Sequence, residues 1–216
     1  MDYVLKNFNN FIIKTYEHLL IISISLLIST ILGILIGVFI SNKKIYASFV
    51  LKLISILFTI PSLALFGILI SILSPFKIGI GRIPAIISLV IYTLLPITRN
   101  TYTAIVSIDK SVLESAKGMG MKRREILTKI IFPLSIPFIM AGIRVGFVLG
   151  IGVGTIAFLI GAGGLGYFIF EGIERSNSQM IISGTIFISL LSIILNYILY
   201  IIEKFLTPKG IRKWLN

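Results

Sequence analysis

Long uncharged stretches constrain this chain more than any other feature of its sequence. The clearest runs from Leu19 to Ile40, 22 residues without a charged side chain. As a helix, that length crosses the roughly 30 Å hydrocarbon core of a bilayer. Only 13% of the 216 residues are charged, against about 25% in soluble domains. Because a backbone in lipid must satisfy its hydrogen bonds internally, the sequence predicts an all-α integral membrane protein.

Five membrane-spanning helices are expected, and the chain is expected to be a single membrane domain. The spans are predicted over about 19–40, 47–73, 84–106, 134–160 and 180–202, with Pro61 inside the second and Pro96 inside the third. Residues 1–18 mix charged and aromatic side chains, which predicts an amphipathic helix at the membrane interface, with His18 as an interfacial side chain. The predicted division is an interfacial helix (1–18), three spans (19–106), a polar loop (107–133), two spans (134–202) and a basic tail (203–216).

The distribution of lysine and arginine predicts the orientation in the membrane. Twelve of these cations flank the spans on the side of the loop 107–133, and five lie on the other side. Positive loops stay in the cytoplasm, so the loop is expected inside and the N-terminus outside. The net charge of +12 does not indicate nucleic-acid binding, because the cations flank apolar segments. The first span is longer than the core of a cleavable signal peptide.

Several kinds of chemistry have no residues to support them. The chain has no cysteine and a single histidine, which excludes disulfides and leaves no set of residues for a metal site. No G-x-x-x-x-G-K-[ST] motif is present to hold ATP. The segment Gly161–Gly166 matches the dinucleotide pattern G-x-G-x-x-G, but it follows a membrane span and therefore predicts a tight turn at the outer end of the fourth span. No nucleophile with a partner base and no pair of carboxylates inside a span favours an enzyme.

The loop 107–133 is the one long segment dense in polar and charged residues. Ser111 and Glu114 have the spacing of a capping box at the start of a short helix. Gly118 and Gly120 predict a turn after it. A second, basic helix is expected to follow and to end at Pro133.

The same loop resembles the signature segment of the permeases of ATP-binding-cassette importers. That pattern is Glu-Ala-Ala, three residues, Gly, nine residues, Ile, any residue and Leu-Pro; here Ser115 replaces the second residue and Phe132 replaces the leucine. The resemblance implies a cytoplasmic coupling helix that sits in a cleft of an ATPase subunit, whereas a solvated loop is the alternative. The residues assigned to ATPase coupling are Ser111, Glu114, Ser115, Ala116, Gly118, Gly120, Ile130 and Pro133.

Five further segments resemble the osmoprotectant branch of these permeases. They are Thr59–Ala64, Leu94–Tyr102, Ile139–Arg144, Leu159–Gly166 and Leu206–Gly210. The resemblance implies the five-helix core of a type I importer, similar to methionine permeases, in the bacterial plasma membrane. It also implies a cytoplasmic ATPase dimer, a second permease chain and an extracytoplasmic binding protein as partners.

The resemblance further implies that glycine betaine, carnitine or choline crosses by alternating access. ATP and magnesium would be bound by the partner ATPase, and no cofactor by this chain. The alternatives are a permease for another small solute such as an amino acid, an exporter permease, and a pore or membrane anchor that works without ATP.

Polar residues at membrane depth are candidates for a transport path or gate, because such residues are costly in lipid. Arg144 is expected either to snorkel or pair structurally, or to serve in transport. Arg99 and its neighbours suit an inner vestibule or an interface anchor, and the proline break in the second span suits a pore element. The candidates are Thr59, Pro61, Ser62, Arg99, Asn100, Tyr102 and Arg144.

Overall fold

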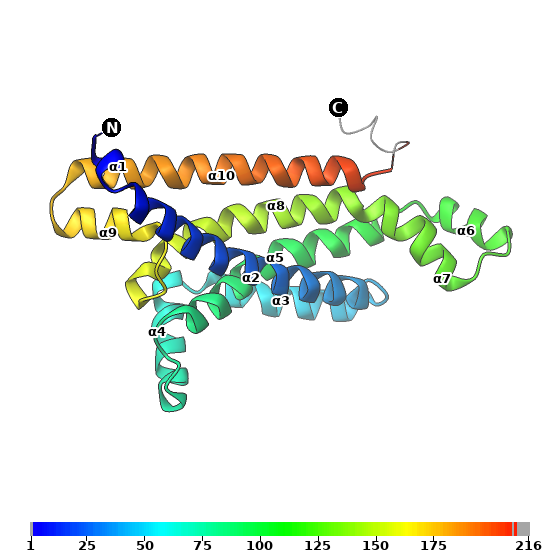
Figure 1. Ribbon diagram of the computed structural model, residues 1–216. Helices are drawn as coiled ribbons and strands as arrows, with labels where there is room; N and C mark the ends of the chain where they lie inside the picture. Colours follow the sequence, from blue (N-terminus) through cyan, green and yellow to red (C-terminus); the bar gives the residue numbers. More distant parts are fainter. Residues whose placement is uncertain (1, 209, 211–216) are drawn as a thin grey trace.

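The computed structural model describes residues 2–208 and 210 as helices joined by short turns, and no strand occurs among these residues (Figure 1). In chain order the helices are α1 (Asp2–Lys6), α2 (Phe8–Ile40), α3 (Lys44–Thr59), α4 (Ser62–Leu73), the 3₁₀ turn η1 (Ser74–Phe76), α5 (Arg82–Val106), α6 (Lys110–Gly118), α7 (Arg123–Ile126), the π-helical turn η2 (Leu127–Ile131), α8 (Phe132–Ile156), the 3₁₀ turn η3 (Ala157–Ile160), α9 (Gly166–Glu174) and α10 (Ser178–Leu206).

Four helical segments of the described chain are long and apolar enough to cross a membrane: Phe8–Ile40, Arg82–Val106, Arg123–Ile160 and Ser178–Leu206. A fifth span is reached if α3 and the segment Ser62–Phe76, bent against each other by 96°, are counted as one. This agrees with the predicted number of spans, but the second span is not one straight helix. Ile60 has an extended backbone with ψ of 127°, because a residue before proline avoids the helical conformation.

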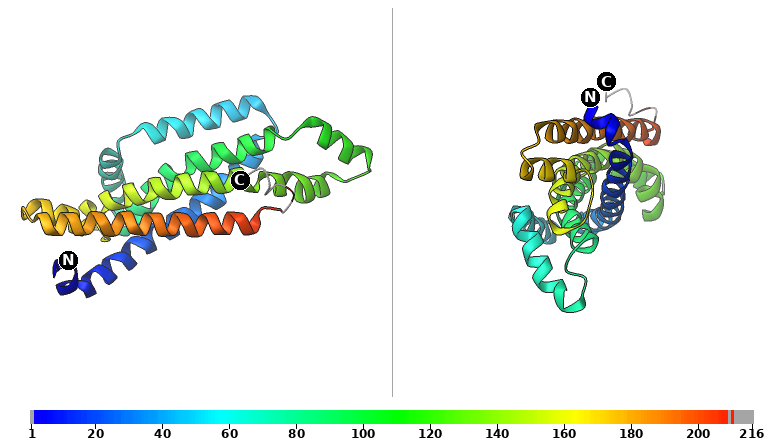
Figure 2. Two further views of the ribbon diagram at one scale, coloured as in Figure 1. Left: turned by 90° about the horizontal axis from the view of Figure 1, so that it is seen from above. Right: turned by 60° about the vertical axis from the view of Figure 1, so that its left-hand side comes forward.

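The bundle is built around α5, which packs between α2 and α8. Figure 2 places α5 and α8 between α3 on one side and α10 on the other, and α4 leaves the bundle at a steep angle. Phe66 keeps the inner face of α4 in contact with the core, where its side chain is buried among Ile21, Leu89 and Ile151.

Glycines set the spacing of these three helices. A Cβ atom on Gly33 of α2 would lie 2.7 Å from Ile97 Cγ2, and one on Gly142 of α8 would lie 2.9 Å from the carbonyl oxygen of Pro96. The backbones are therefore as close as side chains on α5 allow. Close approach through small residues is how helices associate in lipid, where apolar burial gives little driving force.

The N-terminal region differs from the prediction. The helix α2 begins at Phe8 and continues through position 18 without a boundary, so residues 1–18 do not form a separate interfacial helix. Nothing between Phe8 and Ile40 interrupts the helical hydrogen bonds, because the segment contains no proline. Phe11 stacks on Phe168 of α9, with ring centroids 3.7 Å apart. His18 is buried within the protein, 1% exposed, so its predicted interfacial position is wrong.

The segment after the second glycine also differs from the prediction. The basic helix does not end at Pro133; it continues from Arg123 to Ile160 as a single helical segment of 38 residues. The amide of Phe132 donates to the carbonyl of Leu127, five residues back, which is a π-helical bond. That wider turn accommodates Pro133, which has no N–H to donate in the regular pattern.

The predicted outer loop 161–179 contains the nine-residue helix α9, which the sequence analysis missed. Gly172 and Gly184 let α9 lie close against α10, because a Cβ on Gly184 would be 2.6 Å from Phe168 Cβ. The outer segment is therefore packed against the bundle.

The glycine spacing gives a test with a matched control in the same helix. Gly142→Ala should destabilise the detergent-solubilised protein by about 1–3 kcal/mol, because the added methyl group overpacks the α5–α8 contact. Gly152 has nothing within 4 Å of its Cβ position, so Gly152→Ala should leave stability unchanged or raise it by up to about 1 kcal/mol. Thermal unfolding measures both variants, and equal melting temperatures would contradict the described packing.

Candidate functional site

The candidate coupling loop extends beyond one end of the bundle. In Figure 1, α6 and α7 lie past the C-terminal ends of α2 and α5, and the N-terminus lies at the opposite end. The C-terminal end of α10 is on the same side as the loop. The loop and the C-terminal end of α10 thus share the end of the bundle that carries most of the lysines and arginines, as the predicted cytoplasmic side requires.

Asp109, not Ser111, caps the start of α6. Its carboxylate accepts a hydrogen bond of 2.9 Å from the amide of Ser111. The predicted capping box of Ser111 and Glu114 is therefore wrong, because the helix already begins at Lys110. The hydrogen bond from Ser111 holds the pKa of the Asp109 carboxyl below its usual value. The side chains of Ser111, Glu114 and Ser115 are exposed.

Gly120 ends α6 in the way the sequence predicts. Its φ of +77° lies in the left-handed region that favours glycine. Its amide donates to Lys117 at 2.9 Å, and the next amide, of Met121, donates to Ala116 at 3.2 Å. These two bonds form a Schellman motif, which satisfies the last carbonyls of the helix. Ala116 is fully buried under this turn, whereas Gly118 has an ordinary helical backbone and open space around it.

A second cap begins α7. The carboxylate of Glu125 accepts from the amide of Lys122 at 2.9 Å and pairs with Lys129 at 3.2 Å. The sequence signal for this cap is the glutamate at the third helical position, which the sequence analysis did not use. An acidic side chain therefore caps the start of both short helices of the loop.

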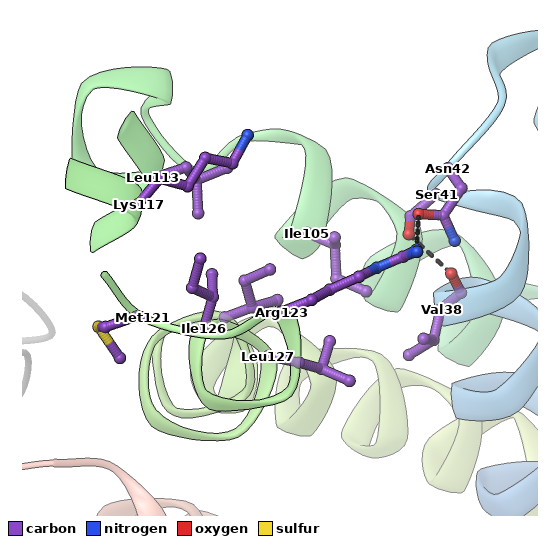
Figure 3. Close-up of a pocket in the computed structure, with 11 residues that line it drawn as sticks. Val38, Ser41, Asn42, Ile105, Leu113, Lys117, Met121, Arg123, Ile126 and Leu127 are labelled. Carbon is purple, nitrogen blue, oxygen red and sulfur yellow. Dashed lines mark hydrogen bonds between the residues drawn. The ribbon is translucent and has the colours of Figure 1, made fainter. Parts of the chain in front are cut away.

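Figure 3 shows the hollow between the two short helices and the ends of the spans. It has a volume of about 430 Å³, and its lining comes from α2, α5, α6, α7 and η2. Across it, the Arg123 guanidinium donates to the Asn42 side-chain oxygen at 3.5 Å. The lining residues are Val38, Ser41, Asn42, Ile105, Leu113, Lys117, Met121, Arg123, Ile126, Leu127 and Ile131.

The loop connects to the outer end of the protein through one helical segment. Arg123–Ile160 is 38 residues long, roughly 57 Å at 1.5 Å per residue. It ends at the glycine turn, where Gly161, Gly163 and Gly164 all have positive φ, and the predicted tight turn is confirmed. There the Glu17 carboxylate of α2 accepts from the amide of Gly164 at 3.0 Å and pairs with Lys14 at 2.9 Å.

The candidate pore residues do not come together in one site. Thr59 and Arg99 line one groove, of about 480 Å³, together with Lys52. Arg144 lies elsewhere, where its guanidinium pairs with Glu203 of α10 at 2.8 Å and lies over the ring of Tyr200. This is the structural pairing expected as one alternative.

The remaining candidates have local roles. Asn100 donates to the carbonyl of Pro96 at 2.8 Å, inside α5. Pro61 and Ser62 form the bend between α3 and α4, where the hydroxyl of Tyr92 donates to the carbonyl of Ile60. Tyr102 is partly buried near the end of α5.

Ile130 and Pro133 belong to the helical segment that leaves the loop, where both are partly buried. Residues 2–208 and 210 contain no group of three or more histidine, cysteine, aspartate or glutamate side chains placed to hold a metal ion. The loop residues instead form a largely exposed surface.

The cap at Asp109 gives a direct test of how α6 begins. Asp109→Ala should speed hydrogen exchange of the first amides of α6, whereas Asp109→Asn should keep the cap, because asparagine caps as well as aspartate. The pKa of the Asp109 carboxyl is lowered in the folded protein. The cap therefore stabilises α6 at pH values above the ordinary pKa of aspartate, and this stabilisation is lost as the pH falls through the lowered pKa. Ser111→Ala is the control and should leave the exchange of these amides unchanged. Faster exchange in Ser111→Ala, with unchanged exchange in Asp109→Ala, would show that Ser111 and Glu114 form the capping box after all.

Comparison with known proteins identifies the family. The family model described as "Binding-protein-dependent transport system inner membrane component" matches residues 29–212. The chain is 40% identical, over 98% of its length, to the osmoprotectant import permease protein OsmW of Salmonella typhimurium, and covers 99% of that protein. It is also 40% identical to the glycine betaine/carnitine/choline transport system permease protein OpuCB of Bacillus subtilis, over 98% of this chain and 95% of the relative.

A solved structure shows the same fold. The MetNI methionine ABC transporter in an inward-facing conformation matches with a TM-score of 0.79 and 21% identity, over 92% of this chain and 96% of that one. With the family match over most of the chain and four apolar spanning segments, or five if the bent pair is one span, this protein belongs to the inner-membrane permease components of binding-protein-dependent ATP-binding-cassette importers.

Proposed function

We propose that this chain is a permease subunit of an ATP-driven importer for osmoprotectant quaternary amines such as glycine betaine, carnitine and choline. The observation that carries the proposal is 40% identity, over nearly the full length, to permeases named for these solutes. Substrate passes between two permease chains as they alternate between inward-facing and outward-facing arrangements. The second permease chain is either a copy of this one or a relative.

The cytoplasmic helix α6 is the proposed contact with the ATPase dimer. Its outer face carries the exposed residues Ser111, Glu114 and Ser115, and Ala116 on its inner face packs against the rest of the loop. A short helix held at both ends presents a defined face to a partner's groove at little further entropic cost. The caps at Asp109 and Gly120 supply that rigidity.

The helical segment Arg123–Ile160 is the proposed path by which movement of the ATPase reaches the outer end. It joins the loop to the glycine turn held by Glu17. A rigid helix moves as a unit, which suits the rocking of packed elements in alternating access. An extracytoplasmic binding protein is proposed to deliver substrate at that outer end.

Nucleotide and magnesium are proposed to bind the partner ATPase, and this chain is proposed to hold no cofactor and to catalyse no reaction. The sequence supports this division, because it lacks the phosphate-binding motif of ATPases. The glycine-rich turn supports it as well, because its Gly164 amide is bonded to Glu17.

Two positions test the coupling proposal, Glu114 through its charge and Gly120 through its backbone conformation. In complex with its ATPase and binding protein, Glu114→Lys should lower glycine betaine uptake by about tenfold or more, since a reversed charge in a docked interface costs several kcal/mol. Glu114→Gln should lower glycine betaine uptake by a smaller factor. Gly120→Val should also lower glycine betaine uptake, whereas Gly120→Asn should retain it, because asparagine tolerates a positive φ and valine does not.

Copurification of the ATPase reads out docking in the same variants. Normal uptake and normal ATPase binding in both Glu114→Lys and Gly120→Val would show that α6 is not the coupling element. If the wild-type complex takes up an amino acid but no quaternary amine, the proposed substrate is wrong and the coupling proposal stands.

A further inference from the structure

A polar stripe runs along the otherwise apolar helix α3. Ser48, Lys52, Ser55 and Thr59 follow one another at intervals of four, three and four residues, so they share one face of the helix. Such a stripe is costly against lipid and indicates a surface that faces water or another protein. The stripe ends at the bend before Pro61.

Arg99 of α5 meets this stripe. The groove of about 480 Å³ is lined by the four polar residues of α3, by Arg99, and by Leu51 and Ile56. Its volume falls within the roughly 300–1,000 Å³ range of small-molecule sites. The side chains of Lys52 and Arg99 are both exposed.

The two cations lie at a similar depth on neighbouring helices. Lys52 is eight residues beyond the cytoplasmic start of α3 at Lys44, roughly 12 Å along the axis. Arg99 is seven residues before the cytoplasmic end of α5 at Val106, roughly 10 Å. Both therefore lie in the cytoplasmic half of the bundle.

Neither cation has an anionic partner in the part of the chain that the structure describes. The ion pairs there are Lys14–Glu17, Lys129–Glu125, Arg144–Glu203 and Arg175–Glu171. The hydroxyl protons of two neighbours are already used, because Ser55 donates to Leu51 and Thr59 donates to Ile56, both at 2.7 Å. The groove therefore offers two positive charges whose N–H donors are free to bind an anion.

We propose that Lys52 and Arg99 form a binding site for the carboxylate of a zwitterionic substrate on its way through the permease. The inference rests on the proposed import function. A guanidinium binds a carboxylate through two parallel hydrogen bonds, and an ammonium adds a point charge. Glycine betaine and carnitine carry a carboxylate, whereas choline has a hydroxyl in its place. The groove thus favours the first two and gives choline no anionic group to bind.

The test compares two substrates that share the quaternary ammonium group. Reconstituted complexes carry the wild-type permease, Lys52→Gln, Arg99→Gln, or the charge-keeping Lys52→Arg and Arg99→Lys. We expect both glutamine variants to lower radiolabelled glycine betaine uptake about tenfold or more. Choline uptake and basal ATPase activity should stay at the wild-type level, and the charge-keeping variants should recover most betaine uptake.

Lys44→Gln is the matched control, because Lys44 is an exposed cation of the same helix that does not line the groove. It should leave betaine uptake unchanged. The inference is overturned if the glutamine variants carry betaine at the wild-type rate. It is also overturned if betaine uptake, choline uptake and basal ATPase activity all fall by the same factor, as a structural role or a bound lipid phosphate would cause.

The wild-type complex separates the two proposals. If it carries neither glycine betaine nor carnitine nor choline, the proposed function fails before any variant is compared. If it carries choline but no carboxylate-bearing amine, the import function stands and the carboxylate site is wrong.

Discussion

The structure depends most on how the chain passes Pro133, where the amide of Phe132 donates a hydrogen bond to the carbonyl of Leu127. This π-helical bond lets the chain pass Pro133 without a break, and so makes one helical segment of Arg123–Ile160. The wider turn gives Pro133 the room it needs, whereas Pro137, one turn further on, lies inside the α-helix α8 itself. Because the segment is continuous, one helical element joins the cytoplasmic loop to the outer glycine turn.

Near each end of that element, one hydrogen bond links it to α2 or to the turn that follows α2. At the cytoplasmic end Arg123 bonds to Asn42 just beyond α2, and at the outer end Gly164 bonds to Glu17. Between them, Arg144 pairs with Glu203 and so joins the same segment to α10. This partly buried ion pair is a specific polar contact between α8 and α10. The arrangement suits the proposed transmission of movement from the ATPase to the outer end.

Much of this could be predicted from the sequence, and the failures have physical causes. Uncharged length predicts the spans, and Gly120 predicts the end of α6, because both depend on local chemistry. The cap at Asp109 was missed because Ser111 fits an equally good local pattern, and the sequence alone does not show that the helix already begins at Lys110. His18 and α9 were misjudged because their burial depends on residues far apart in the chain. Lys52 was overlooked as a site residue, although the spacing of the polar residues on α3 was visible in the sequence.

The most direct test of the central claim is whether accumulation of solute requires ATP. Radiolabelled glycine betaine would be measured in proteoliposomes that hold this permease with its ATPase and binding protein, with ATP, without it, and with a non-hydrolysable analogue. We expect glycine betaine to accumulate above its external concentration only when hydrolysable ATP is present, because the permease moves substrate only as the ATPase turns over. Equilibration of glycine betaine without ATP would contradict it and would indicate a pore.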